Sequence, residues 1–177
     1  MGVRAIALSA VALAFIFLQS GPTGAQSSRD QESPIGKVAT LEGSASIQRK
    51  VVVAAVAGVG GLLEVKAGDV VYQGDLIQTA AASKLGLVFA DGTALNVFSD
   101  AQVELNEFVY VPEGKRNSSV FNLVKGTFTV IGGKMARTGE MRMNTAVATL
   151  GIRGTAAHIV VGDDGSVRFS TLVEEKH

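Results

Sequence analysis

The stretch ATLGIRGTAAHIVV, residues 148–161, holds the residue types and spacing that come nearest to a known binding chemistry. Gly151 and Gly154 lie three residues apart with Arg153 between them, as in loops that clamp a phosphate or a nucleic-acid backbone. A phosphate loop needs a helix start after the glycines, so that backbone N–H groups point at the anion. The TAAHIVV that follows predicts a strand instead. We therefore expect a structural corner at Gly151, Arg153, Gly154 and Thr155, where the glycines provide positive φ or close backbone packing and Arg153 folds back onto a carbonyl or carboxylate.

A second group of residues with binding chemistry is basic and lies just upstream. The stretch GGKMARTGEMR contains Lys134, Arg137 and Arg142, and Lys115 and Arg116 precede it. Such a cluster is usually a solvated loop. The alternative is a local patch, formed by Lys134, Arg137 and Arg142, that binds an acidic partner or an anionic glycan.

The remaining reactive residue types give no reason to expect an enzyme. The chain has two histidines, of which His158 lies within a predicted strand and His177 is the last residue. There is no cysteine, no G-x-S-x-G elbow and no S-x-x-K pair, and GDDGS lacks the alternating oxygen ligands of a calcium loop. Acidic residues next to glycine are expected to stabilise turns; they are Asp69, Asp75, Asp91, Asp163 and Asp164. We expect no catalytic residue, metal or cofactor.

Composition limits the classes of partner and fold. The 177 residues suffice for one ordinary domain, and 16 Lys and Arg balance 16 Asp and Glu. A balanced chain has no overall field that would attract nucleic acid or an anionic membrane, so neither is expected as a partner. Abundant glycine together with many Val, Thr and Ala favours a β protein with many turns.

The N-terminal residues resemble a targeting segment rather than part of the fold. Arg4 precedes an apolar run from Ala5 to Leu18, and a small-x-small ending reaches Ala25. This layout predicts a secretory signal peptide over 1–25, cleaved after Ala25. The alternative is an uncleaved anchor, but the run is shorter than the roughly 20 residues that span a bilayer. We expect export to the periplasm or beyond, with no membrane span after cleavage. Residues 26–34 are expected to form a flexible leader.

From residue 35 the hydrophobic period is two, which predicts strands. Residues 35–47 alternate as one half-buried strand, or as two with a kink at Gly43, and residues 84–98 alternate on both sides of a hairpin turn at Asp91 and Gly92. Turn signals recur roughly every 8 to 12 residues. We expect an all-β roll or sandwich of many short, mostly antiparallel strands over 35–170, with a short β-helix-like arrangement as the alternative. A polar tail follows at 171–177.

The segment VVVAAVAGVGG, residues 51–61, does not fit this alternation. It is apolar at every position up to its glycines and too short to cross a membrane. It is expected to be either a buried strand or a flexible insertion, while its uncharged, β-branched character also suits an adhesive strand that binds a partner.

Five stretches of the chain, in order, resemble the FecR domain. They are IGKVATLEGSASI, the paired Gly-Asp steps and Asp-Gly-Thr hairpin within residues 65–97, FNLVKGTFTV, and TLGIRGTAAHIVV with its glycine-Arg-Gly-Thr signature. The resemblance spans about 35–161. It implies a periplasmic domain that, in iron-transport regulators, binds the signalling domain of an outer-membrane receptor.

Those regulators also carry a cytoplasmic anti-sigma segment and a transmembrane helix before the domain. Here a signal peptide takes that place, so the resemblance implies a stand-alone exported FecR domain in a Gram-negative-type envelope. Two functions follow as expectations. The first is a non-enzymatic sensory or regulatory module that binds another cell-envelope protein through a strand edge or loop face. The second is a module that binds cell-wall glycan or peptidoglycan through the basic patch.

Overall fold

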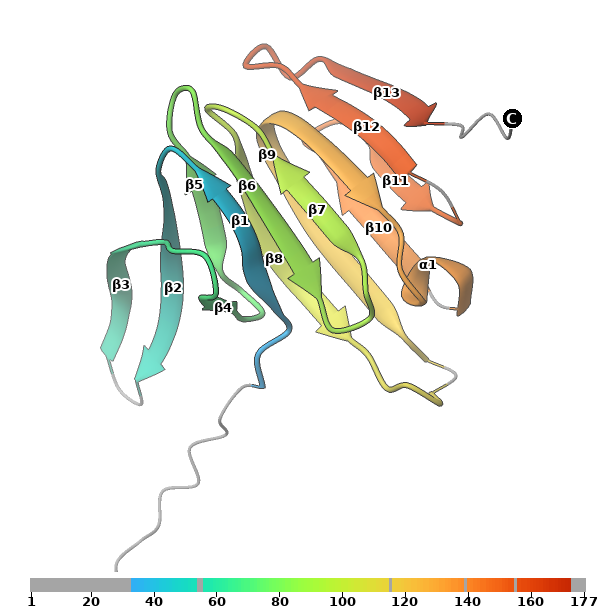
Figure 1. The fold of residues 1–177 in the computed structure, drawn as a ribbon, viewed down its shortest axis with the longest axis horizontal. Coiled ribbons are helices and arrows are strands. Elements are labelled where there is room, and N and C mark those ends of the chain that lie inside the picture. Colours follow the sequence, from blue (N-terminus) through green and yellow to red (C-terminus); the bar gives the residue numbers. More distant parts are fainter. Residues whose placement is uncertain (1–32, 54–55, 115, 139, 155, 173–177) are drawn as a thin grey trace, which may run out of the picture. The chain divides into compact units, whose positions relative to one another are not determined.

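One long strand, β9 (Ser118–Ile131), runs through both halves of an all-β fold. The computed structural model describes residues 33–53, 56–114, 116–138, 140–154 and 156–172. These residues belong to a unit that begins at Glu32, close to the predicted start of the folded part at residue 35. The predicted all-β class is confirmed, because strands dominate and the helical content is one short turn (Figure 1).

Thirteen strands and one helix are described. Besides β9, their bounds are β1 (Gly36–Glu42), β2 (Ala45–Val53), β3 (Val56–Glu64), β4 (Val70–Val71), β5 (Leu76–Thr79), β6 (Lys84–Phe89), β7 (Ala94–Val97), β8 (Gln102–Val109), α1 (Met135–Thr138), β10 (Glu140–Asn144), β11 (Thr149–Ile152), β12 (Ala156–Val161) and β13 (Val167–Leu172).

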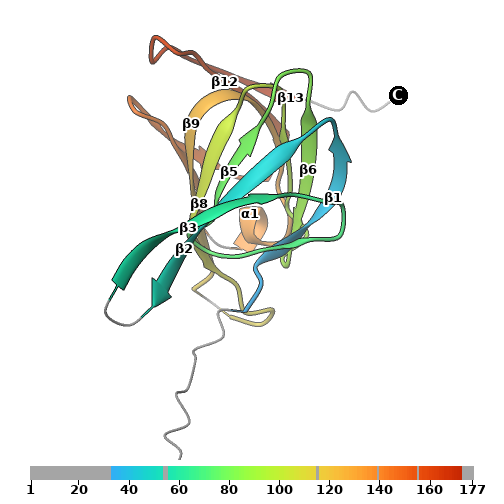
Figure 2. The ribbon, with the colours of Figure 1, turned by 90° about the vertical axis from the view of Figure 1, so that its left-hand side faces the viewer.

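The strands form one sheet that folds over at β9 into two halves. Half A has the order β4-β1-β6-β7-β9-β12-β13, and half B has the order β3-β2-β5-β8-β9-β10-β11. Described pairs are antiparallel except β9 with β10, which is parallel. Figure 2 shows the resulting curl of the sheet. Of the predicted roll or sandwich, the pairing gives a single curled, mostly antiparallel sheet, and it is not that of a parallel β-helix.

A single glycine explains how β9 serves both halves. Up to Lys125 the strand pairs with β8, and from Gly126 onward it pairs with β7 and β12. Gly126 has φ +104°, and a Cβ there would lie 2.3 Å from the Cβ of Ala101. The predicted strand-glycine-strand unit is therefore one continuous strand, bent where only glycine fits.

The core lies between the two halves and consists of alternate side chains of the strands. Phe121, Leu123, Phe128 and Val130 of β9 are almost completely buried. The ring of Phe89 stacks on that of Phe121 with 4.8 Å between centroids. The period of two in the sequence is thus the period of burial.

The hairpin over 84–98 is confirmed as β6 and β7, and the kink at Gly43 separates β1 from β2. The predicted alternation of 35–47 fails at Ala39, which is exposed, because a register shift between Val38 and Thr40 moves Val38 into the core. Val147 is also exposed, at 68%, because it lies in a turn beyond the end of β10.

Residues 51–61 lie mostly in a hairpin rather than in a loop. The end of β2 pairs with the start of β3, from Val53 opposite Val56 to Lys50 opposite Val59. Residues 54 and 55 lie outside the described residues. At the other end of the chain, β13 extends to Leu172, so the predicted tail begins within a strand, and 173–177 lie outside the described residues.

Candidate binding site

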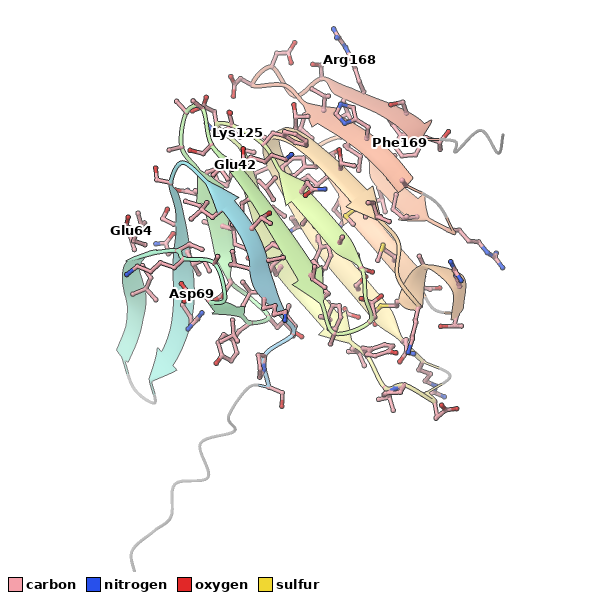
Figure 3. All side chains as sticks on the ribbon, viewed as in Figure 1. Glu42, Glu64, Asp69, Lys125, Arg168 and Phe169 are labelled. Atoms are coloured by element: carbon pink, nitrogen blue, oxygen red, sulfur yellow. The ribbon has the colours of Figure 1, made fainter. Side chains whose placement is uncertain are left out.

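Two Gly-Asp steps build a pair of matching turns. The Asp69 N–H donates to the Lys66 carbonyl, and the Lys66 N–H donates back to the Asp69 carboxylate at 2.8 Å. Asp75 repeats this arrangement with Tyr72 at 2.9 Å. Gly68 and Gly74 precede the two aspartates with φ of +94° and +84°. The predicted role of Asp69 (Figure 3) and Asp75 in stabilising turns is confirmed.

The second of these turns also anchors the β2–β3 hairpin. Asp75 is fully buried, and its two carboxylate oxygens accept hydrogen bonds from Nε and Nη2 of Arg49 at 2.9 and 3.1 Å. The guanidinium lies 4.4 Å from the ring centroid of Tyr72. The hydrogen bonds to Asp75 raise the pKa of Arg49 above its ordinary value. A bidentate pair of this kind is a specific link between β2 and the turn.

A third aspartate, Asp91, holds the helical turn α1 in place. Its buried carboxylate accepts hydrogen bonds from the N–H and the hydroxyl of Thr93 and from the N–H of Met135, at 3.0, 2.7 and 3.1 Å. The Lys134 N–H donates to the Asp91 carbonyl. Asp91 and Gly92 thus form the predicted hairpin turn, and Asp91 also fixes α1 against it. This second role could not be read from the local motif.

Helix α1 lies at one end of the hairpin formed by β10 and β11. Residues of α1 and of this hairpin line a groove of about 490 Å³. We call it the arginine groove, and its lining residues are Arg137, Thr138, Glu140, Met141, Arg142, Gly151, Ile152 and Arg153. Met141 and Ile152 are buried, whereas the three arginines are exposed. Gly151 lies opposite Arg142 in the ladder, and a Cβ added at Gly151 would meet no atom within 4 Å.

The charges of the groove are unequal. Three arginines face one carboxylate, Glu140, which forms an ion pair with Arg142 at 2.7 Å. Neither Arg137 nor Arg153 has an ion pair or a side-chain hydrogen bond with a described residue. Guanidinium groups match the geometry of carboxylate and phosphate oxygens, so the groove is suited to an anionic ligand.

The structure brings together residues from two separate predictions. Arg137 and Arg142 of the basic patch share the groove with Gly151 and Arg153 of the predicted corner, whereas Lys134 does not line it. Glu140 is a lining residue that sequence reasoning missed, although its position two residues before Arg142 puts it on the same face of a strand.

The predicted corner is correct only in part. Gly154 has φ +84°, as expected. Gly151 has neither a positive φ nor a close neighbour, because it lies on the exposed face of β11. Arg153 was expected to fold back, and it makes no such contact with a described residue. Thr155 lies outside the described residues.

His158 lies in β12, with its Nδ1 3.2 Å from the hydroxyl of Thr129. In the described part of the chain, no three His, Cys, Asp or Glu side chains gather as metal ligands would. Within the same residues, no helix has the length and apolar character required to cross a membrane.

Comparison with known proteins identifies the family. The family model described as FecR protein matches residues 75–173, which is more than half of the chain. Comparisons with curated proteins and with solved structures found no match. The matched region starts at Asp75, later than the resemblance at residue 35, although β1 pairs with β6 of the matched region. It includes β10, β11 and the whole arginine groove, and on this match the chain belongs to the FecR protein family.

Proposed function

We propose that this chain is an exported, non-enzymatic FecR-domain protein that binds another cell-envelope protein and acts as a sensory or regulatory module. FecR domains typically serve in signalling, and the family is associated with the cell envelope. The observation that carries the proposal is the arginine groove, where the guanidinium groups of Arg137 and Arg153 have no ion pair with a described residue and lie beside the exposed face of β11. Arginine is enriched in protein interfaces relative to the rest of the surface.

The test is capture of the partner in living cells. The full chain, with a C-terminal tag, is expressed and crosslinked in whole cells, and the captured proteins are identified by mass spectrometry. A control without residues 1–25 remains in the cytoplasm. We expect one dominant envelope protein that the control does not capture. Recovery of nothing specific from the exported form would rule out the proposal.

The same groove supports a second candidate function, binding of anionic cell-wall glycan. The observation that favours it is the excess of three arginines over one glutamate in the groove. This function predicts that the protein is retained on purified peptidoglycan and is released as salt is raised, because exposed charges are screened. Retention that does not depend on salt would argue against it.

A further inference from the structure

The outer edge of β11 offers backbone groups for binding, in addition to the side chains of the arginine groove. Within the described residues β11 pairs with β10 and with no other strand. It is therefore a sheet edge, and an edge presents unpaired N–H and C=O groups that can pair with another chain.

The register identifies which backbone groups are free. The Glu140 N–H donates to the Asn117 carbonyl. The even-numbered residues of β10 therefore direct their backbone N–H and C=O groups toward β9, and the odd-numbered residues direct theirs toward β11. Met141 and Met143 lie opposite Ile152 and Leu150. Thr149 and Gly151 are therefore the residues of β11 whose N–H and C=O point away from β10.

Three arginine side chains lie near this edge, together with one acidic side chain, Glu140. Gly151 pairs with Arg142, and Arg153 follows two residues later on the same exposed face. Arg137 reaches the groove from α1. Because Gly151 has no side chain and open space above it, nothing on β11 separates these guanidinium groups from an incoming strand.

We propose that β11 binds an extended acidic peptide segment of the partner by strand addition. Backbone hydrogen bonds form with Thr149 and Gly151, and carboxylates at alternate positions of the peptide meet Arg142, Arg153 and Arg137. This inference rests on the proposed function and names the chemistry of its partner. The free backbone edge favours a peptide over a glycan, because a glycan has no regular row of N–H and C=O groups.

Other edges fit this ligand less well. On β13, the outermost strand of half A, Phe169 is 45% exposed next to Arg168 (Figure 3). On β3, Leu62 and Leu63 are exposed, and Glu64 is acidic. Neither edge has several arginines lining a common groove, so β11 is the edge that electrostatics favours for an acidic strand.

The test uses a short peptide of alternating Thr and Glu, and its isostere of alternating Thr and Gln. Binding to the protein purified from cells that express the full chain is followed by NMR. We expect the Glu peptide to bind, to shift the signals of β10 and β11, and to slow amide exchange at Thr149 and Gly151. The Gln peptide is expected to bind more weakly.

Three variants separate charge from backbone pairing. Arg137→Gln/Arg153→Gln is expected to weaken binding of the Glu peptide roughly tenfold, because two exposed ion pairs are lost. Gly151→Pro removes one outward N–H without removing a bond to β10, and is expected to weaken binding of both peptides. Arg168→Gln, on the edge strand β13 outside the groove, is the charge control and should bind as the wild type does. Circular dichroism confirms that each variant is folded.

The outcomes distinguish this inference from the function on which it rests. Three outcomes would each overturn strand addition at β11. They are equal binding of both peptides, no effect of Gly151→Pro in a folded protein, and binding of the anionic glycan polygalacturonate but not of the Glu peptide. If the partner is captured in cells and Arg137→Gln/Arg153→Gln does not reduce the capture, the proposed function stands and this inference fails. If no partner is captured, the proposed function fails regardless of the peptide result.

Discussion

Two glycines with contrasting surroundings test the structure at the scale of single residues. A Cβ at Gly133 would lie 2.4 Å from the Thr93 nitrogen and 2.6 Å from the Asp91 carbonyl oxygen, and both are backbone atoms that cannot easily move. Gly133→Ala should therefore lower the free energy of unfolding by about 2 kcal/mol. Gly151→Ala meets no atom and should change it by less than about 0.5 kcal/mol. Urea unfolding followed by circular dichroism measures both. Equal effects would contradict the placement of α1 against the hairpin turn.

Asp91 gives a second prediction at this scale. Its carboxylate satisfies three donors, from Thr93 and Met135, in a buried position. Asp91→Ala leaves these donors without an acceptor and should lower the free energy of unfolding by about 3 kcal/mol. Asp163→Ala, at an exposed turn, is the matched control and should cost less than about 0.5 kcal/mol. If the two variants melt alike, Asp91 does not hold α1.

At the scale of elements, the Arg49–Asp75 pair connects the β2–β3 hairpin to the second Gly-Asp turn. Arg49→Met leaves the buried carboxylate without its cation and should lower the free energy of unfolding by about 2 kcal/mol, less than for a fully buried pair because Arg49 is 33% exposed. The double variant Arg49→Met/Asp75→Asn should recover part of this loss, which a double-mutant cycle measures.

The pH dependence of this link follows from the raised pKa of Arg49. Because the pKa of Arg49 is higher in the folded than in the unfolded protein, the Arg49–Asp75 pair contributes its full stabilisation at any pH below the pKa of an unfolded arginine. This contribution is lost only as pH rises through the higher pKa of the folded protein. The difference in unfolding free energy between wild type and Arg49→Met should therefore stay constant across the neutral range. A difference that shrinks between neutral and mildly alkaline pH would contradict the pair.

Local patterns predicted elements well where the signal lies within the element itself. The hairpin at Asp91 and Gly92 and the strand after Gly154 follow from alternation and turn chemistry. The bulge at Val38 and the role of Gly151 did not, since both depend on which strand lies alongside. For the same reason the basic patch and the predicted corner were two separate predictions. Only the register of β10 and β11 shows that Arg142 and Gly151 are neighbours.

At the scale of the whole molecule, the sequence predicted an all-β roll or sandwich, but not that a single strand would divide one sheet into two halves. That division depends on β9, whose bend requires a glycine at 126 because Ala101 occupies the space of a Cβ. Nothing near Gly126 in the sequence points to Ala101 as a neighbour. Among the described strands, half A and half B are joined by backbone pairing only through β9. The sheet is therefore continuous from one half to the other along this strand.

This continuity predicts that the two halves unfold together. Native-state hydrogen exchange should give the same opening free energy for the amides of Leu87 in half A and Ile77 in half B. Phe128→Leu changes a buried ring in the part of β9 that belongs to half A, and should lower both values by about 1 kcal/mol. Phe169→Leu on the exposed face of β13 is the control, and should leave both unchanged within about 0.5 kcal/mol. A decrease at Leu87 without one at Ile77 would show that the halves are independent, and that β9 joins them without coupling their stability.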